Sequence, residues 1–253
     1  MSTLRAAERE LRFFTLTWKG QVFTAMIAPI LTLVAMGIGL GGLIDSEEPG
    51  LGGLDYIEFV TPGLLVGSAV QMGVGGAMWP VMAGHKWLGF HRAMISSPLT
   101  PWNVYAGYQL WLTGRTIAVA SAFLLAGALL GGVISPWGLV AIPVTAATVV
   151  AFTAPVAAFS ARADSDLAFD PMIRLVVMPL YLFSGTFFPA DEVPLLLQWL
   201  AKVFPLWHGV ELARASTTGS WSAGLAVNVV VLCVYIAAGA WWGARTFRQR
   251  LAA

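Results

Sequence analysis

Charged residues are scarce in this sequence. Only 11% of the 253 residues are Asp, Glu, Lys or Arg, while 58% are hydrophobic. An ordinary soluble domain has about 25% charged and about 45–50% apolar residues. No single soluble core could bury this much apolar surface, so the natural solvent of the chain is lipid. The net charge of +1 gives no indication of nucleic-acid binding. We therefore expect an integral membrane protein without a nucleic-acid partner.

Cysteine and the common catalytic motifs are also scarce. Cys233 is the only cysteine, which excludes an internal disulfide. No lysine is followed by Ser or Thr, as a P-loop requires, so we expect no nucleotide-binding site in the chain itself. The histidines His85, His91 and His208 have no His or Cys three or four residues away, which argues against a zinc site. We predict no catalytic residue, bound metal or cofactor in this chain.

Long uncharged runs predict six transmembrane helices. A helix needs about 20 apolar residues to cross the hydrocarbon core. The runs lie at residues 22–43, 59–82, 104–130, 137–159, 172–188 and 223–244. The predicted fold is therefore an all-α integral membrane protein that forms a single transmembrane domain over residues 1–253.

The charges between these runs predict an orientation. Eleven of the basic residues lie before the first run, after the second and fourth runs, or in the C-terminal tail. The other loops hold only Lys202 and Arg214 as basic residues. They also hold the acidic residues Asp45, Glu47, Glu48, Asp55 and Glu58. The positive-inside rule therefore places both chain termini in the cytoplasm.

Residues 3–19 predict a helix that lies in the membrane interface. Apolar side chains recur at helical spacing on one face, and arginines lie off that face. The apolar face has Leu4, Ala7, Leu11, Phe14 and Trp18, and the charged face has Arg5, Arg9 and Arg12. A charged face opposite a Leu/Phe/Trp face suits the interface plane. The alternative is a simple basic anchor for the first span.

The segment between the second and third runs is longer than a connection needs. Connections in helix bundles usually take about 2–8 residues, whereas residues 84–105 form a polar and aromatic stretch that is closed by Pro98 and Pro101. We predict a short helix at residues 86–96 that docks on another molecule. The docking residues are His85, Lys86, Trp87, Phe90, His91 and Arg92. The alternative is an ordinary amphipathic loop.

Arg115 is the one clear charge within a predicted span. Such an arginine usually marks a cavity or a partner, because its insertion costs about 2.5–3.5 kcal/mol at mid-bilayer. Counted from residue 104, Arg115 lies about 16 Å deep. If Trp102, Tyr105, Tyr108 and Trp111 form an interfacial aromatic belt, Arg115 is only about 6 Å deep and snorkels to the headgroups, and we favour this shallow position.

Three acids follow the fourth run, at Asp164, Asp166 and Asp170. Acids at this spacing can bind a divalent metal. They would then indicate a membrane-embedded enzyme that modifies lipids. The sequence Asp170-Pro171 also suits a helix cap followed by proline at the first helical position, which we favour.

Two motifs resemble type-2 ABC exporter permeases. One is "YIEFVTPGLLV" at Tyr56–Val66, and the other is "FSGTFFPADEVP…LQWLAKVFPLWHGVELAR" within Phe183–Arg214. The second motif resembles most closely the branch with nodulation-factor lipo-oligosaccharide exporters and polyketide-drug exporters. The resemblance covers nearly the whole chain.

The resemblance implies roles for the polar segments. Residues 189–217 would form a re-entrant hairpin of two helices, at about 193–203 and 206–217, which dips into the outer leaflet and closes the substrate path. Its gate residues would be Phe187, Phe188, Trp199, Trp207, His208, Glu211 and Arg214. His208, Glu211 and Arg214 could form a small charge network, which we expect to cap the hairpin rather than to contact substrate. Arg115 would line the substrate path.

The resemblance also implies partners. Residues 3–19 would be the interface helix, and residues 86–96 the coupling helix that docks on a separate ATPase subunit. Two ATPase subunits would bind ATP and Mg²⁺, and a second permease subunit would complete the path in the bacterial inner membrane. The substrate would be a lipid-linked glycan, an amphipathic drug or a lipid. The competing interpretation is an ion-coupled secondary transporter, which usually has ionisable coupling residues at the midplane.

Overall fold

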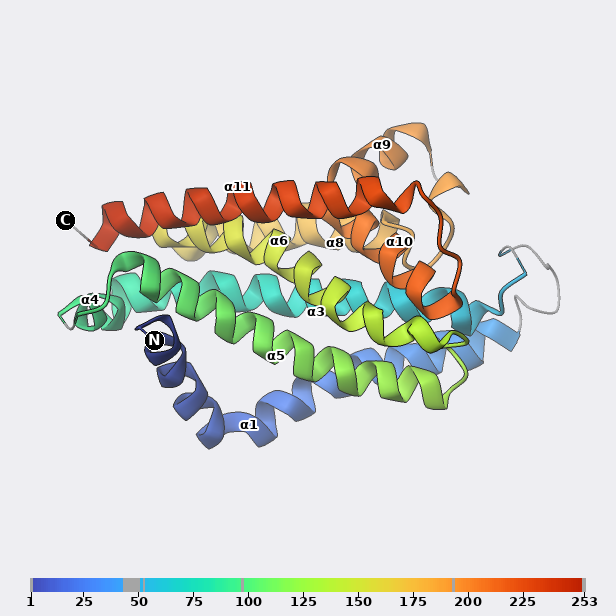
Figure 1. The fold of residues 1–253 in the computed structure, drawn as a ribbon, viewed down its shortest axis with the longest axis horizontal. Coiled ribbons are helices and arrows are strands. Elements are labelled where there is room, and N and C mark those ends of the chain that lie inside the picture. Colours follow the sequence, from blue (N-terminus) through green and yellow to red (C-terminus); the bar gives the residue numbers. More distant parts are fainter. Residues whose placement is uncertain (1, 43–50, 52, 97, 193, 252–253) are drawn as a thin grey trace.

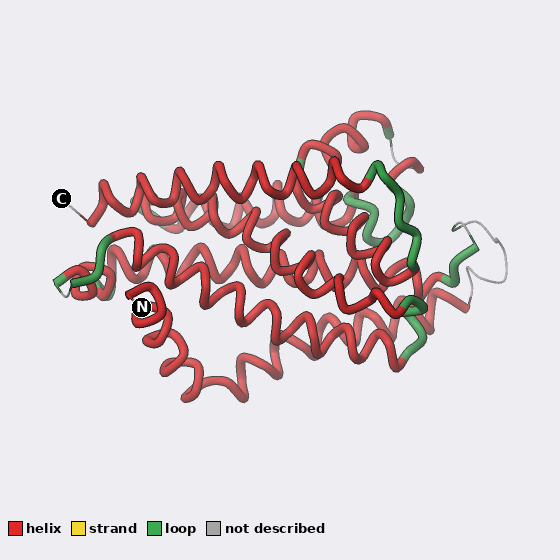
Figure 2. The backbone as a smooth tube through the Cα atoms, in the orientation of Figure 1, coloured by secondary structure: helices red, strands yellow, loops and turns green. Residues whose placement is uncertain are grey.

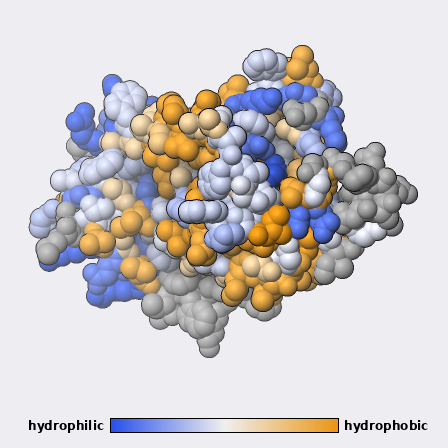
Figure 3. Space-filling model, turned by 45° about the vertical axis from the view of Figure 1, so that its right-hand side comes forward, coloured by the Kyte–Doolittle hydropathy of each residue, from blue (hydrophilic) through white to orange (hydrophobic). Residues whose placement is uncertain are grey.

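The computed structural model describes residues 2–42, 51, 53–96, 98–192 and 194–251. These residues form a bundle of helices without strands, which confirms the all-α prediction for the described part of the chain. Helices lie along the bundle, and loops gather at its two ends (Figures 1 and 2). Apolar side chains cover much of the middle of the face shown in Figure 3, and hydrophilic ones gather toward its edges.

Long helices alternate with short helical turns along the chain. The first half comprises α1 (Ser2–Val34), the π-helical turn η1 (Ala35–Leu40), α3 (Tyr56–Met82), the π-helical turn η2 (Ala83–Trp87), α4 (Phe90–Ile95) and α5 (Pro101–Leu129). The middle comprises η3 (Pro136–Val140), α6 (Ala141–Arg162), η4 (Asp166–Ala168), α7 (Phe169–Met172), η5 (Ile173–Val177) and α8 (Met178–Phe183). The last part comprises η6 (Ala190–Glu192), α9 (Leu195–Val203), α10 (Pro205–Thr218) and α11 (Leu225–Leu251).

The two ends of the bundle hold different segments. Both chain termini and α4 lie toward one end, which we call the terminal end. Residues 184–192, η3, α9 and the start of α11 lie toward the other, which we call the hairpin end (Figure 1). The eleven basic residues that the sequence assigns to one side belong to segments at the terminal end, with α4 and the tail of α11 among them.

Four helical stretches are long and apolar enough to cross a membrane. They are Tyr56–Trp87, Pro101–Leu129, Pro136–Arg162 and Leu225–Leu251. They coincide with the second, third, fourth and sixth predicted spans, and they identify a multi-pass membrane protein. The first stretch is central, because 72% of its most apolar part is buried, against 17% in Leu225–Leu251.

The first and fifth predicted spans differ from the structure. The helix that begins at Ser2 runs on without a break, so the interface helix at 3–19 and the span at 22–43 form one bent helix (Figure 1). Within the described residues, the apolar stretch Met26–Gly37 lies inside the first predicted span, and residue 43 of that span lies outside the described part of the structure. The fifth helix ends at Phe183, so the predicted extension to residue 188 was wrong. Gly185, with φ 77°, belongs to a turn that the apolar composition of this run does not reveal.

Local signals explain where the other helices begin and end. Thr100 accepts a hydrogen bond from Asn103 N (3.3 Å) and caps α5, whose first residue is Pro101. Pro205 separates α9 from α10 and occupies the first turn of α10. Gly219, with φ 81°, follows the end of α10. The predicted break of the hairpin at Pro205 coincides with the break between these helices.

Candidate functional sites at the two ends of the bundle

An exposed corner between α3 and α4 lies at the terminal end. Trp87 is 56% exposed and Leu88 is 71% exposed, although both are large and apolar. Gly89 follows with φ 63°, a left-handed conformation that favours glycine, and α4 starts at Phe90. The single helix predicted at residues 86–96 was therefore wrong, because Lys86 and Trp87 end the preceding helix.

The two histidines of this corner are internal rather than part of its outer surface. Nδ1 of His91 lies 2.6 Å from Nδ1 of His85, and His91 is only 1% exposed. Both rings pack against the buried ring of Phe247 on α11. The centroid distance is 5.8 Å for His91 and 4.8 Å for His85. A Cβ on Gly84 would lie 2.6 Å from Cζ of Phe90, so glycine permits this close approach. The histidines thus hold α4 on the bundle and leave Trp87 and Leu88 outside.

Basic side chains join this corner to the loop after α6. Lys86 Nζ donates to the carbonyl oxygen of Asp164. Arg250 Nη2 donates to the carbonyl oxygen of Arg162 (2.6 Å) and lies 3.8 Å from Oδ1 of Asp164. Arg92 was also predicted here, but its side chain lies outside the described part of the structure.

The three acids of this loop do not converge on a metal site. Among the described residues, no group of three or more His, Cys, Asp or Glu side chains is arranged to hold a metal ion. The side chain of Asp164 is almost fully exposed, and Asp170 lies in the short helix α7. This geometry gives no support to the metal-dependent enzyme that the spacing allowed.

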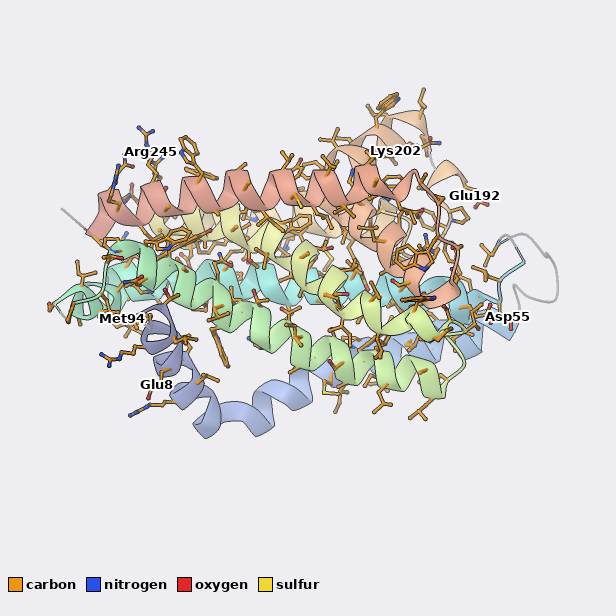
Figure 4. All side chains as sticks on the ribbon, viewed as in Figure 1. Glu8, Asp55, Met94, Glu192, Lys202 and Arg245 are labelled. Atoms are coloured by element: carbon orange, nitrogen blue, oxygen red, sulfur yellow. The ribbon has the colours of Figure 1, made fainter. Side chains whose placement is uncertain are left out.

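The predicted interface helix packs its small residues on α5. A Cβ on Gly107 would lie 2.6 Å from Cβ of Ala6, and Ala6 and Ala7 are buried. Arg5 and Arg12 are exposed, and Arg12 Nη2 donates to Glu8 Oε1 (2.7 Å) on the outer face. Figure 4 shows Glu8 on the part of α1 that diverges from the bundle. The predicted side chains of Arg9 and Trp18 lie outside the described part of the structure.

Arg115 lies at the middle of α5, about 21 Å from either helix end at 1.5 Å per residue. It lines a cavity of about 580 Å³ between α1 and α5, whose other described lining residues are Leu4, Ala7, Leu11, Met26, Leu110, Trp111, Gly114, Ala118, Val119 and Ala122. Tyr105 and Tyr108 do not form the predicted aromatic belt, because both are buried. They donate to the carbonyl oxygens of Ala154 (3.3 Å) and Gly76 (2.6 Å). The argument for a shallow Arg115 therefore fails.

Arg214 connects three elements at the hairpin end. Its Nη1 donates to Glu211 Oε1 (2.7 Å) within α10, and its Nη2 donates to the carbonyl oxygen of Gly185 (2.5 Å) in the turn after α8. The guanidinium also lies 4.0 Å from the ring centroid of Phe59 on α3. Burial lowers the pKa of Arg214 and the Glu211 carboxylate opposes this, but an arginine stays protonated in proteins.

His208 is not part of the Glu211–Arg214 pair. Its Nδ1 lies 2.7 Å from Oδ1 of Asn228 on α11, and its Nε2 donates to the carbonyl oxygen of Lys202 (2.8 Å). The predicted network of three charged residues was therefore wrong. Residues three apart on a helix are rotated by about 60° around its axis, so His208 and Arg214, which are six apart on α10, point about 120° away from each other. The spacing of residues along α10 could not predict the contact between His208 and Asn228, because Asn228 lies on another helix.

Three of the predicted gate aromatics, Phe187, Phe188 and Trp207, pack against other rings, whereas Trp199 is exposed. Phe187 and Phe188 pack against α8: their rings lie 5.2 Å from that of Tyr181 and 6.2 Å from that of Phe183, and Tyr56 Oη donates to the carbonyl oxygen of Phe187 (3.3 Å). Trp207 packs against His208 (4.9 Å between ring centroids). Trp199 is exposed on α9, with Leu195, Leu196, Leu200 and Val203. In Figure 1, α9 stands away from the bundle.

Two glycines of α3 permit the close approach of α8 and of the turn that follows it. The spacing of Gly63 and Gly67 in "PGLLVG" predicts close packing, and the structure confirms it. A Cβ on Gly63 would lie 2.7 Å from Cα of Thr186, and a Cβ on Gly67 would overlap the ring of Tyr181.

We expect Gly63→Ala to lower the thermal unfolding midpoint in detergent by roughly 3–10 °C, because the added methyl group meets backbone atoms. Gly75→Ala in the same helix is the matched control, because no atom of the described residues lies within 4 Å of its added Cβ. Alanine is the better helix former, so this control should keep or raise the midpoint. Equal shifts in the two variants would contradict the close approach at Gly63.

The chain is similar to a family of transporters and to several nodulation proteins. The family model of the ABC-2 type transporter matches residues 6–218. Nodulation protein J of Rhizobium leguminosarum bv. viciae is 26% identical over 225 residues, which cover 87% of this chain and 85% of that protein. Nodulation protein J of R. leguminosarum bv. trifolii is 26% identical over 247 residues, and that of Rhizobium meliloti strain 1021 is 24% identical over 242; each alignment covers 93% of this chain and 90% of the relative.

The family match covers more than half of the chain, and the membrane-spanning helices agree with it. The relatives align over most of their own length, so the likeness extends beyond a single motif. This chain belongs to the ABC-2 type transporter family, as the membrane permease subunit of a transporter.

Proposed function

We propose that this chain is the permease subunit of an ATP-driven exporter in a bacterial inner membrane. Two separate ATPase subunits would bind ATP and Mg²⁺, and a second permease subunit, identical or different, would complete the path. The substrate is an amphiphile, such as a lipid-linked glycan, a drug or a lipid. The family supports the role of a permease, and the names of the relatives support a link to nodulation.

The exposed corner at the terminal end carries this proposal. Trp87 and Leu88 project large apolar surface at a helix end, although α4 beside them is held to the bundle by His91. Exposed aromatic and apolar residues on a rigid support are typical of protein interfaces. Figure 4 shows Met94 of α4 toward the same end of the bundle. An ATPase that pushes on this corner would act directly on α3, the central helix.

The exposed face of α9 supports a role of α9 and α10 at the outer end of the transport path. Leu196, Trp199 and Val203 lie on it at helical spacing, and all three are exposed. A short helix with one such face can insert its apolar side chains into the outer leaflet. Arg214 holds the neighbouring α10 to the turn at Gly185 and to α3. In this proposal, α9 and α10 close the outer end of the path.

The proposed orientation predicts a pattern of thiol labelling. In a Cys233→Ser background the chain has no cysteine, so single cysteines can be placed at the exposed positions Leu88 and Ser220. We expect an impermeant maleimide to label Ser220→Cys in intact cells, because the loop between α10 and α11 would lie outside. Leu88→Cys should react only after permeabilisation. The reverse pattern would show that the termini are external.

A second candidate function is ion-coupled secondary transport, which the central position of Arg115 in a cavity favours. Inside-out vesicles with the chain and its ATPase separate the two functions. We expect a fluorescent lipo-oligosaccharide to accumulate when ATP and Mg²⁺ are added outside, and not when a proton or sodium gradient is imposed without ATP. Accumulation driven by the gradient alone would overturn the proposal of an ATP-driven exporter.

A further inference from the structure

A second cavity lies at the terminal end, between the start of α5 and the last turns of α11. Its volume is about 390 Å³, and its lining includes Thr100, Trp102, Trp241, Arg245 and Arg248. Beneath the cavity the two helices are joined by a buried hydrogen bond. Tyr105 Oη on α5 donates to the carbonyl oxygen of Gly239 on α11 (3.4 Å). The cavity therefore lies between two helices that are fixed to each other.

The cavity is positively charged, and no carboxylate is among its described lining residues. Arg245 and Arg248 are three residues apart on one face of α11, and both are exposed. Within the described part of the chain, neither of them forms an ion pair. The guanidinium of Arg245 lies 5.8 Å from the ring centroid of Trp241, and Figure 4 shows Arg245 directed away from the bundle. Two adjacent guanidinium groups suit a phosphate, which they can bind through charge-assisted hydrogen bonds.

An apolar track continues from the cavity along α11. Val227, Val230, Val234 and Trp241 recur at intervals of three, four and seven residues, and all are exposed. They therefore lie on the same face as the two arginines. In a membrane-spanning helix this face is covered by lipid tails, and tryptophan prefers the level of the headgroups. The cavity thus combines a site for an anionic head with a surface for acyl chains.

We propose that this cavity binds an anionic phospholipid of the membrane. Arg245 and Arg248 hold its phosphate, Trp102 and Trp241 flank the glycerol region, and the acyl chains lie along the apolar track of α11. A basic pocket between transmembrane helices is a recognised site for anionic headgroups. This proposal needs only a membrane-embedded chain, so it does not rest on the ATPase partner or on export.

Native mass spectrometry of the intact chain in detergent tests this site, with phosphatidylglycerol and phosphatidylcholine as probes. We expect phosphatidylglycerol to bind more tightly than phosphatidylcholine. Each basic residue near a membrane contributes roughly fivefold to the affinity for anionic lipid, so Arg245→Gln with Arg248→Gln should weaken phosphatidylglycerol binding by roughly 30-fold. The matched control is Arg5→Gln with Arg12→Gln, which removes the same charge from exposed positions on α1 outside the cavity and should weaken that affinity by less than about fivefold.

Several results would overturn the lipid site. Equal binding of the two lipids, or equal losses in the two double variants, would show that the cavity is only part of the general lipid-facing surface. Equally tight binding of free inorganic phosphate or glycerol 3-phosphate would show an anion site that does not need a lipid. If the Arg245/Arg248 variant keeps phosphatidylglycerol binding but loses a partner protein, these arginines belong to a protein interface instead.

Discussion

Replacement of Trp87 and Leu88 together by glutamate is expected to weaken binding of the ATPase subunit by at least roughly 30-fold. The two side chains are mostly exposed and belong to no buried core cluster, so their substitution leaves no cavity in the bundle core. Central aromatic residues of an interface often contribute about 2 kcal/mol or more each, and a buried carboxylate without a partner adds a further cost. A binding titration of the purified ATPase against the detergent-solubilised permease measures the loss.

The chain offers a close control at its opposite end. Trp137 and Leu139 lie in η3 at the hairpin end, and both are exposed. Trp137→Glu with Leu139→Glu makes the same chemical change, but far from the proposed docking corner, so ATPase binding should stay within about twofold of wild type. If the control loses as much affinity as the Trp87/Leu88 variant, docking at the corner is contradicted.

Arg214→Ala is expected to lower the stability of the folded chain by roughly 2–4 kcal/mol. The side chain of Arg214 is 13% exposed, and its removal leaves the carboxylate of Glu211 without its cation. The carbonyl oxygen of Gly185 also loses its donor. Since Glu211 remains a third exposed, water compensates part of this loss. The thermal unfolding midpoint in detergent should fall by about 5–15 °C.

Glu211→Gln distinguishes the separate contacts of Arg214. This variant keeps a side-chain acceptor for Nη1 and leaves the bond to Gly185 intact. We expect it to cost less than half as much as Arg214→Ala, about 1 kcal/mol or less. If the two variants are equally destabilised, Arg214 acts mainly through the carboxylate. The structural role assigned to Gly185 would then be wrong.

The features that sequence reveals best here are those set by local chemistry. Long uncharged runs reveal the four stretches that can cross a membrane, because desolvated backbone must be helical. Pro205 marks the break between α9 and α10, since proline cannot continue a helix from its preceding turn. The glycines at 63 and 67 indicate close packing, because only a residue without a side chain leaves room for the backbone of Thr186 and the ring of Tyr181.

Features set by distant contacts were harder to predict. In α5, apolar residues surround the helix, so periodicity could not show that Tyr105 and Tyr108 face the interior. The end of α8 at Phe183 follows from a turn that α3 and Arg214 hold in place, and residues 184–188 carry no charge or proline that would mark it. His208 has the spacing of a charge network, but tertiary packing directs it to Asn228.

The most direct test of the central claim is co-purification of an ATPase with the tagged wild-type chain in mild detergent. The chain has no P-loop lysine of its own, so any ATP hydrolysis in the purified sample must come from a bound partner. We predict that ATP hydrolysis co-purifies with the wild type and with the Trp137/Leu139 control, and is lost with the Trp87/Leu88 variant. If no ATPase accompanies any of the three, the proposal of an ATP-driven permease is contradicted.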